Sequence, residues 1–305
     1  MQNNNINNQV VVNTEGYKLH YWQFNDLVAF LKATVSLPIN HEVFYKLASS
    51  EVDQDFYYFK TFKEAWNNCY FGWDKEFENF KDAIKHVETQ TILDISKKDT
   101  YAVYGFRPNV PRYLNNNPRN MLTTKSDNKF KRTVVINCNT AYSWYESKQA
   151  IFNRGVCIIN LIKQLEINNN VVLNLFECVE NDDEMIYTTI NLKKENERIN
   201  LKQVYFPLVN PDFLRRLIFR IIECTFDIKE SWFDGYGAPY IPTERDKDYL
   251  NNSIYISTPE KMNITGRILK NDYQNFLNCV ASQDYYKKNI EHEDEKDFTR
   301  KRTRN

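Results

Sequence analysis

The sequence is poor in glycine, carries no net charge and has no long apolar run, and each shortage excludes a class of protein. Seven glycines among 305 residues are too few for a Gly-rich phosphate-binding loop, and neither G-x-x-x-x-G-K nor G-x-G-x-x-G occurs. Lysine plus arginine equals aspartate plus glutamate at 40 each, so no overall charge points to nucleic acid or to an anionic membrane surface. No segment approaches the ~20 apolar residues of a membrane-spanning helix, so we expect no membrane partner.

The usual signatures of catalysis and metal binding are also missing. The six cysteines form no C-x-x-C pair and the four histidines show no metal-ligand spacing, so the sequence predicts reduced core cysteines, no metal and no cofactor. No G-x-S-x-G nucleophile elbow occurs, and no histidine falls within residues 131–283. The neighbouring acids Asp182 and Asp183 fall in an expected hairpin turn, where charge is ordinarily solvated. These absences favour a protein that is not an enzyme.

Composition divides the chain into four parts. Residues 1–12 are polar and Asn-rich and predict a disordered N-terminus, whereas residues 284–305 carry charges of both signs and predict a disordered tail. Residues 13–130 predict a helical and irregular region that packs on the core. Residues 131–283 predict an α/β core domain.

Within residues 13–130, the clearest signals are helix starts. Thr61 and Glu64 have the spacing of a capping box, in which each side chain satisfies a backbone donor of the other residue. This box predicts a helix that runs to Phe71, with Gly72 at its C-terminal end. Pro111 predicts a single helical turn in the stretch before Leu114.

The core domain alternates strands and helices. Residues 133–136, 171–176, 185–192 and 253–257 predict strands, because they are apolar runs or alternate in polarity. Predicted helices begin at a capping box formed by Ser143 and Glu146, at Asn210 followed by Pro211, and at residue 271. We expect Gly155 to interrupt the first of these, which is then one kinked helix or two segments. Helices between strands require crossover connections, so the fold class is α/β, with a mostly parallel Rossmann-like sheet and flanking helices.

The loop after the first core strand, Asn137-Cys-Asn-Thr-Ala-Tyr-Ser143, is the expected place for a ligand. Ligands on open α/β sheets bind beyond the carboxyl ends of the strands. The order of elements resembles a von Willebrand factor A domain, a family whose first strand ends in an Asp-x-Ser-x-Ser metal motif. The matching positions here are Asn137, Asn139 and Ala141. Because neutral amides are weak ligands for a hard cation, we expect no metal, and the alternative is that both asparagines satisfy loop backbone.

Arginine and tyrosine supply the remaining candidate binding residues. Arg215 and Arg216 can be read as an anion site or as part of a solvated helix face, although the Arg216 stem is placed to cover core. Arg154, beside Gly155, can be read as a phosphate contact or as a helix-surface residue. Tyr236 lies between two glycines and can stack on a base or simply pack in a turn.

Five short phrases in register resemble an uncharacterised protein family encoded by tailed bacteriophages. They are Phe62-Lys-Glu-Ala-Trp66 with Gly72-Trp73, Pro108-Asn-Val-Pro-Arg-Tyr-Leu114 with Pro118 and Met121, Arg154-Gly155 leading to Leu165-Glu166, Asn210-Pro-Asp-Phe-Leu-Arg-Arg-Leu-Ile-Phe219 with Glu223, and Gly235-Tyr-Gly237. The resemblance covers roughly residues 56 to 260 and implies a phage origin without a mechanism. The chain departs from the family pattern in its loop Asn115-Asn-Asn-Pro118, where a glycine usually precedes the methionine.

Three functions remain open from the sequence. The first is a non-enzymatic interaction or assembly protein that binds a phage or host protein, in the host cell cytoplasm or on the virion. The second is nucleic-acid binding through Arg107, Arg112, Arg119, the Arg215/Arg216 pair and the basic tail. The third is an enzyme with an unfamiliar site near residues 137–143. The sequence does not define the oligomeric state.

Overall fold

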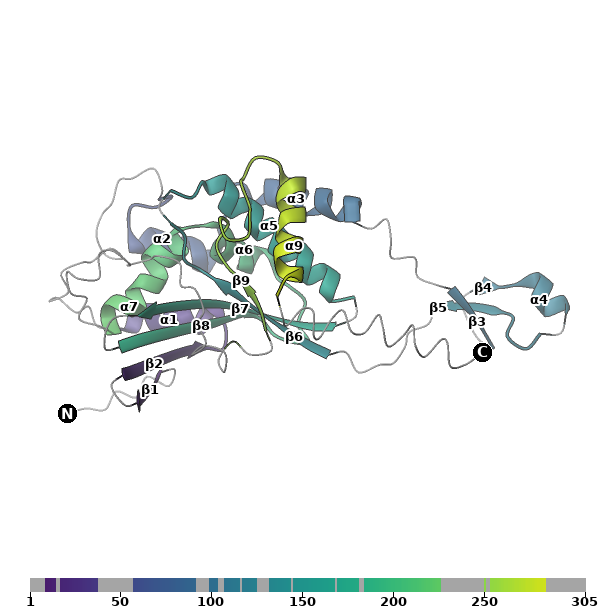
Figure 1. Ribbon diagram of the computed structural model, residues 1–305, viewed down its shortest axis with the longest axis horizontal. Coiled ribbons are helices and arrows are strands. Elements are labelled where there is room, and N and C mark those ends of the chain that lie inside the picture. The colour runs from purple at the N-terminus through teal and green to yellow at the C-terminus, as the bar shows by residue number, and fades with distance from the viewer. Residues whose placement is uncertain are drawn as a thin grey trace.

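The computed structural model describes most of the chain as one large sheet covered by helices and one small sheet (Figure 1). The described residues are 9–14, 17–37, 57–91, 99–103, 107–115, 117–124, 132–143, 145–167, 169–180, 184–225, 250 and 253–283. Their strands are β1 (Gln9–Thr14), β2 (Tyr17–Phe24), β3 (Asp99–Ala102), β4 (Arg107–Pro108), β5 (Met121–Thr124), β6 (Arg132–Asn139), β7 (Asn169–Glu180), β8 (Glu184–Lys193) and β9 (Ser253–Ile256). Their helices are α1 (Leu27–Ser36), α2 (Phe62–Phe71), α3 (Phe77–Thr91), α4 (Val110–Leu114), α5 (Lys148–Leu165), α6 (Leu201–Val209), the π-helix η2 (Phe213–Ile218), α7 (Phe219–Thr225) and α9 (Leu269–Ala281).

The large sheet has six strands in the order β1-β2-β8-β7-β6-β9. The pairs β2/β8, β6/β7 and β6/β9 are parallel, whereas β1/β2 and β7/β8 are antiparallel. Three of the five pairs are therefore parallel, which confirms the predicted α/β class with a mostly parallel sheet. The parallel pair β6/β7 is joined through α5, as a crossover connection requires.

The first hairpin of the sheet was not predicted. Residues 9–12, expected to be disordered, belong to β1, and β1 pairs with β2 along its whole length. The asparagines around the valines of β1 obscured its β-branched character. In β2, His20, Trp22 and Phe24 are buried, which is the period of two that a half-buried strand shows. The region predicted as helical and irregular therefore contributes β2 and the last two residues of β1 to the large sheet.

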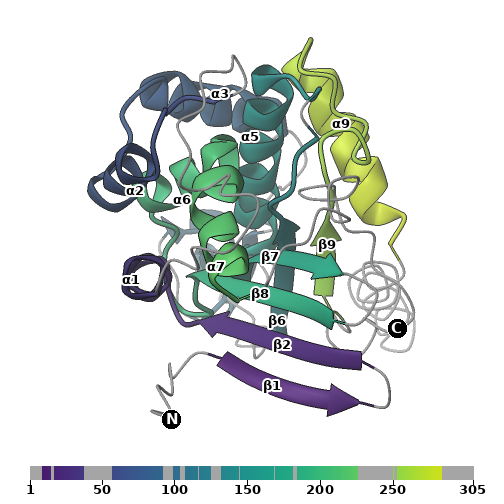
Figure 2. The ribbon, with the colours of Figure 1, turned by 90° about the vertical axis from the view of Figure 1, so that its left-hand side faces the viewer.

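The helices gather over one face of the large sheet, as Figure 2 shows. That face carries Ile136 and Cys138 of β6 and Leu173 and Leu175 of β7, each at most 1% exposed. The longest helix, α5, runs as one helix through Gly155, so the alternative of two separate segments is wrong. A Cβ atom at Gly155 would lie 2.5 Å from Cγ1 of Val209. The glycine thus allows α5 and α6 to approach each other closely.

Two predicted helix starts differ from the structure. The capping box at Thr61 and Glu64 is confirmed, with the Thr61 hydroxyl accepting from the Glu64 amide at 3.2 Å. Ser143, however, does not cap α5. The helix begins four residues later, where the Ser147 hydroxyl accepts from the Ala150 amide. Both serines precede the same apolar stripe, so the sequence pattern suits either of them.

The single helix predicted from Asn210 to residue 223 is instead the end of one helix followed by two others. Asn210 ends α6, and its side-chain oxygen accepts a hydrogen bond from the Asp212 amide. The chain then forms η2 before it continues as α7. The helix α6 escaped prediction because Pro207 lies within it, and proline ordinarily disrupts helices.

A second, three-stranded sheet in the order β3-β5-β4 carries α4 on its connection, and we refer to residues 99–103, 107–115 and 117–124 as the arm. The arm stands apart from the six-stranded sheet in Figure 1. All six cysteines are free thiols. In the described part of the chain, no helix combines the length and apolarity needed to cross a bilayer.

Candidate functional site

The carboxyl edge of the large sheet, where β6 and β9 end, is held by one buried arginine. Arg154 is 1% exposed, and α5 aims its guanidinium at the chain that leaves both strands. It donates to the carbonyl oxygens of Ser257 at 2.7 Å, Asn139 at 2.7 Å and Ile256 at 3.1 Å, and to the Tyr142 hydroxyl at 2.9 Å. Arg154 is therefore neither a helix-surface residue nor an open phosphate contact, because its donors are engaged within the fold.

A ladder of amide side chains crosses four strands of the sheet. The Asn191 amide donates to Asn174, that of Asn174 donates to Asn137, and that of Asn137 donates to the Ser253 hydroxyl, at 2.9 to 3.0 Å. Because buried polar groups need partners, this ladder fixes how β8, β7, β6 and β9 lie against one another. The sequence analysis expected Asn137 to serve loop backbone, whereas it connects strands.

Asn139 does serve its own loop, as expected. Its side-chain oxygen accepts from the Ala141 amide at 2.6 Å, and its amide donates to the Tyr255 hydroxyl at 2.7 Å. The oxygens of Asn137 and Asn139 thus both accept hydrogen bonds from protein groups and are not directed at a common cation. Within the described ranges, no three His, Cys, Asp or Glu side chains converge as metal ligands.

A buried acid lies beside this loop. Glu177, in β7, is 1% exposed and accepts a hydrogen bond of 2.5 Å from the Thr140 hydroxyl. Burial raises the pKa of Glu177 to about 8, against the opposing effects of Thr140 and of the Arg215 charge. Arg215 itself donates to the Tyr142 carbonyl at 3.0 Å. The structure therefore brings Asn139, Arg154 and Arg215 to the same loop, but as supports of its backbone.

Arg216 lies elsewhere and holds the chain before α2. Its side chain is fully buried and donates to the carbonyl oxygens of Phe59 at 3.3 Å and Lys60 at 2.7 Å. Asp212 binds the same segment, because one of its carboxylate oxygens accepts hydrogen bonds from the backbone amides of Tyr58 and Phe59. Burial raises the pKa of Asp212 to about 6. The solvated-face reading of this helix is wrong, whereas the expectation that Arg216 covers core is confirmed.

A crevice of about 700 Å³ opens beyond the end of β9, beside the first turn of α5. Two acids line it, Glu146 and Glu260, and the Tyr145 hydroxyl donates to Glu260 at 2.9 Å. Burial raises the pKa of Glu146 to about 7. Both carboxyl oxygens of Glu146 are shielded from solvent, so they cannot contact a molecule in the crevice without a side-chain movement. The pair is thus poorly placed for general acid–base catalysis.

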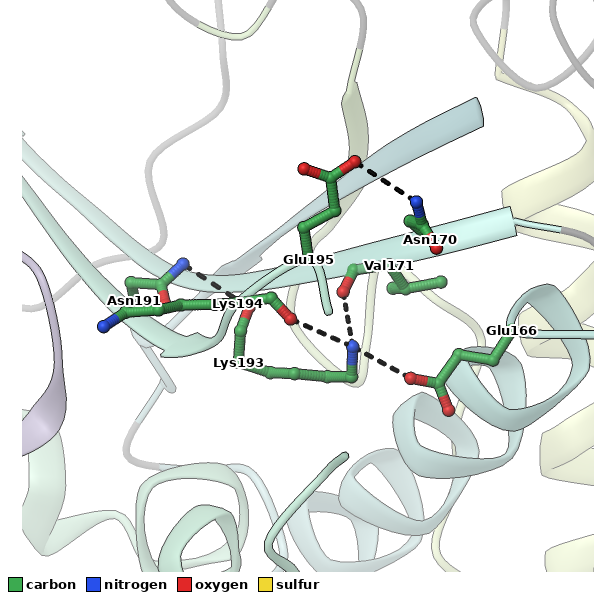
Figure 3. Close-up of polar contacts among 7 residues, drawn as sticks. All are labelled: Glu166, Asn170, Val171, Asn191, Lys193, Lys194 and Glu195. Carbon is green, nitrogen blue, oxygen red and sulfur yellow. Dashed lines mark hydrogen bonds and ion pairs between the residues drawn. The ribbon is translucent and has the colours of Figure 1, made fainter. Parts of the chain in front are cut away.

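The opposite edge of the sheet holds a buried lysine that the sequence analysis missed. The Nζ of Lys193 donates to the carbonyl oxygens of Val171 at 2.6 Å and Lys194 at 3.2 Å and lies 2.8 Å from Glu166, as Figure 3 shows. Glu166 ends α5, so Lys193 joins that helix to the register shift between β7 and β8. Its signal in the sequence is a lysine directly after the alternating run 185–192.

Two predicted site residues remain, Ser143 and Tyr236. Ser143 is partly buried, and its carbonyl accepts from the Glu146 amide in the turn before α5. Tyr236 lies outside the described residues. The predicted site residues that the structure describes therefore serve as internal supports of the fold.

The arm presents the opposite picture, because its apolar residues face solvent. In α4, Val110, Tyr113 and Leu114 are 59%, 66% and 72% exposed, and their spacing places them on one face of the helix. Val103, beside β3, is 69% exposed. Apolar helix faces normally turn toward a core, and the outward stripe of α4 departs from that pattern. Sequence analysis located this helical turn but not the direction of its stripe.

Comparison with known proteins identifies a family to which no activity is assigned. A family model described as a domain of unknown function, DUF7192, matches residues 4–288. No curated protein and no solved structure matches the chain. With a match over nearly its whole length, the chain belongs to the DUF7192 family.

Proposed function

We propose that this protein is a non-enzymatic interaction protein that recognises a protein partner through the apolar stripe of α4. The observation that carries the proposal is the outward exposure of Val110, Tyr113 and Leu114. An exposed aromatic residue beside aliphatic neighbours is typical of the central contacts of protein interfaces. The engagement of Arg154 and Arg216 in internal hydrogen bonds supports the absence of an enzymatic role.

The phage resemblance gives the proposal its biological setting. The protein would be phage-encoded and act in the host cell cytoplasm or on the virion, with a phage or host protein as partner. Its core would be a von Willebrand factor A-like domain without the family's metal site. The asparagines Asn137 and Asn139 at the end of β6, where the family has acidic and hydroxyl ligands, and the mostly parallel sheet support this reading.

The test compares partner capture by matched variants. The full chain is expressed with an affinity tag in its own host, as wild type, as Val110→Ser/Tyr113→Ser/Leu114→Ser, and as the control Val10→Ser/Val11→Ser/Val12→Ser. The control replaces three valines of β1 that are 60%, 45% and 41% exposed. We expect one protein to bind the wild type and the control and to be lost with the α4 variant, and then to bind purified protein with the same ranking. Equal capture of the partner by all three chains would exclude the apolar stripe of α4 as the binding surface.

Nucleic-acid binding is a second candidate, and one observation favours it. Arg107, Arg112 and Arg119 all belong to the arm, together with the exposed Tyr113 ring. Arginines beside an aromatic ring are the combination that single-stranded nucleic acids bind. This candidate predicts affinity that falls steeply with salt and is lost in Arg112→Gln/Arg119→Gln. A gel-shift experiment that finds no complex at low salt would exclude it.

A further inference from the structure

The large sheet ends in two edge strands, β9 and β1, and their backbones are treated differently. The outer edge of β9 is covered by one side chain. The side-chain amide of Gln283 accepts from the Tyr255 backbone amide at 3.0 Å and donates to the Tyr255 carbonyl at 2.6 Å. These are the two hydrogen bonds that a neighbouring strand would make. Because unpaired backbone groups on an edge strand attract strands of other chains, Gln283 protects β9 from such pairing.

The edge at β1 has no such cover among the described residues. Figure 2 shows β1 as the outermost strand, and the strand that pairs with it is β2. The side chains of Val10, Val11 and Val12 are exposed. In an antiparallel pair, alternate residues direct their backbone amide and carbonyl groups away from the neighbouring strand. On the outer side of β1 these groups are therefore available to a second strand.

The residues of β1 also lack the features that usually protect an edge strand. Natural edge strands carry charged side chains, a proline or a β-bulge, each of which discourages pairing with another chain. The six residues of β1, Gln-Val-Val-Val-Asn-Thr, include no charge and no proline. Their pairing with β2 continues without a register shift. The strand is therefore regular and uncharged, and its valines favour a further strand beside it.

The sequence of β1 is suited to pairing with a second copy of itself. In an antiparallel pair centred on Val11, this valine lies opposite its own counterpart. Val10 then lies opposite Val12 of the second copy, and Gln9 lies opposite Asn13. Valine thus meets valine and amide meets amide. A charged residue near such a two-fold axis would meet the same charge and repel it, and β1 carries none.

This pairing would also extend an apolar strip on one face of the sheet. Val10 and Val12 lie opposite Tyr21 and Leu19 of β2, so the four side chains share a face. Leu19 and Tyr21 are half-buried, whereas the two valines are exposed. A second β1 strand would bring two more valines to the same strip. Because each valine would lose solvent contact, the hydrophobic effect would add to the backbone hydrogen bonds.

We propose that two copies of this chain associate through β1, as antiparallel edge strands related by a two-fold axis at Val11. The two large sheets then become one continuous sheet. The register from Gln9 to Asn13 supplies about four to six backbone hydrogen bonds. Such a small interface predicts a dimer that dissociates on dilution. The pairing does not involve α4, so a chain that loses the dimer keeps the surface proposed for a protein partner.

Sedimentation velocity of the full chain over a concentration series tests the association. We expect the wild type to shift from monomer to dimer as concentration rises. Val11→Lys places two positive charges at the axis and should dimerise at least about 10-fold more weakly. Ile268→Lys is the matched control, since Ile268 is exposed before α9, and it should dimerise as the wild type does. A wild type that stays monomeric up to about 1 mM would overturn the proposal and leave the edge to a strand of another protein.

Disulfide cross-linking tests the register without a disruptive charge. Val11→Cys places two thiols opposite each other, at a Cα separation within the roughly 4.4–6.8 Å that a disulfide spans. In Val10→Cys the two thiols are diagonal neighbours about 7–8 Å apart, which is too far. We therefore expect Val11→Cys to form a covalent dimer on oxidation, with Val10→Cys no more cross-linked than the wild type and its native cysteines. Equal cross-linking of Val10→Cys and Val11→Cys, or none with Val11→Cys, would overturn the proposal.

Discussion

The carboxyl edge of the large sheet buries a charged side chain, whereas the arm exposes apolar side chains. At the carboxyl edge, the cationic side chain of Arg154 is 1% exposed and donates to carbonyl oxygens and one hydroxyl. On the arm, the apolar side chains of Val110, Tyr113 and Leu114 are more than half exposed. A charged side chain in the core therefore joins segments of the fold, whereas the apolar side chains of α4 face solvent. We expect the first kind of residue to determine stability and the second kind to determine partner binding.

The largest effect should come from removing the buried arginine. Arg154→Ala leaves the carbonyl oxygens of Asn139, Ile256 and Ser257 without their donor and opens a cavity. Buried acceptors without partners and the loss of a buried charge network are costly, so we expect a loss of roughly 3–5 kcal/mol in the free energy of unfolding. Urea denaturation with an unchanged m-value measures it.

Arg267 provides the matched control for that measurement. It is exposed in the loop before α9, and Arg267→Ala should change the free energy of unfolding by less than about 0.5 kcal/mol. Equal effects of the two substitutions would show that burial does not distinguish core arginines from surface ones in this fold.

Gly155→Ala should have the next largest effect. The added Cβ would lie 2.5 Å from Cγ1 of Val209, a stiff and buried side chain. Overpacking costs about 1–3 kcal/mol, which outweighs the gain of about 1 kcal/mol from the better helix propensity of alanine. In a double-mutant cycle with Val209→Ala, the two losses should be less than additive, since the second change removes the clash. Additive losses would mean that the helices do not meet at this point.

Glu177 gives the core a pH dependence. Its pKa is about 8 in the fold against an ordinary value of 4.5, because of its burial. Between these values the folded protein binds a proton that the unfolded chain has lost, so stability falls as pH rises from about 4.5 to 8. Glu177→Gln removes this penalty and should stabilise the protein at pH 8 by on the order of 2 kcal/mol, with almost no gain near pH 4.5.

Thermal melts across this pH range measure the effect. Glu197→Gln, which neutralises an exposed acid, serves as control and should leave the pH profile unchanged. A Glu177→Gln profile parallel to that of the wild type would mean that Glu177 is ionised in the fold at neutral pH.

Most of the core was predictable from the sequence because it rests on local signals. The apolar runs of β6 and β7 and the capping box of α2 depend on neighbouring residues alone, and the structure confirms them. The helix α6 was not predictable by the same means, because Pro207 is a local breaker that tertiary packing overrides. The hairpin of β1 and β2 likewise depends on pairing with β8, almost 170 residues away in the chain.

The candidate site was harder to predict, since burial decides what a polar residue does. Arg154, Arg215 and Arg216 were noticed for their charge, but the carbonyl oxygens that they contact come from distant segments. Lys193 lacked any local signal except its place after an alternating strand.

The smallest effect on stability should accompany the largest effect on partner binding. Tyr113→Ser removes a ring that is 66% exposed, so the free energy of unfolding should change by less than about 0.5 kcal/mol. Capture of the partner should nevertheless fall on the order of 10-fold or more, because exposed aromatic residues dominate interface energies. Melting and capture measured on the same preparation separate the two quantities. A large drop in stability would instead place the Tyr113 ring in the fold of the arm, and the contrast between arm and core would fail at the residue on which it most depends.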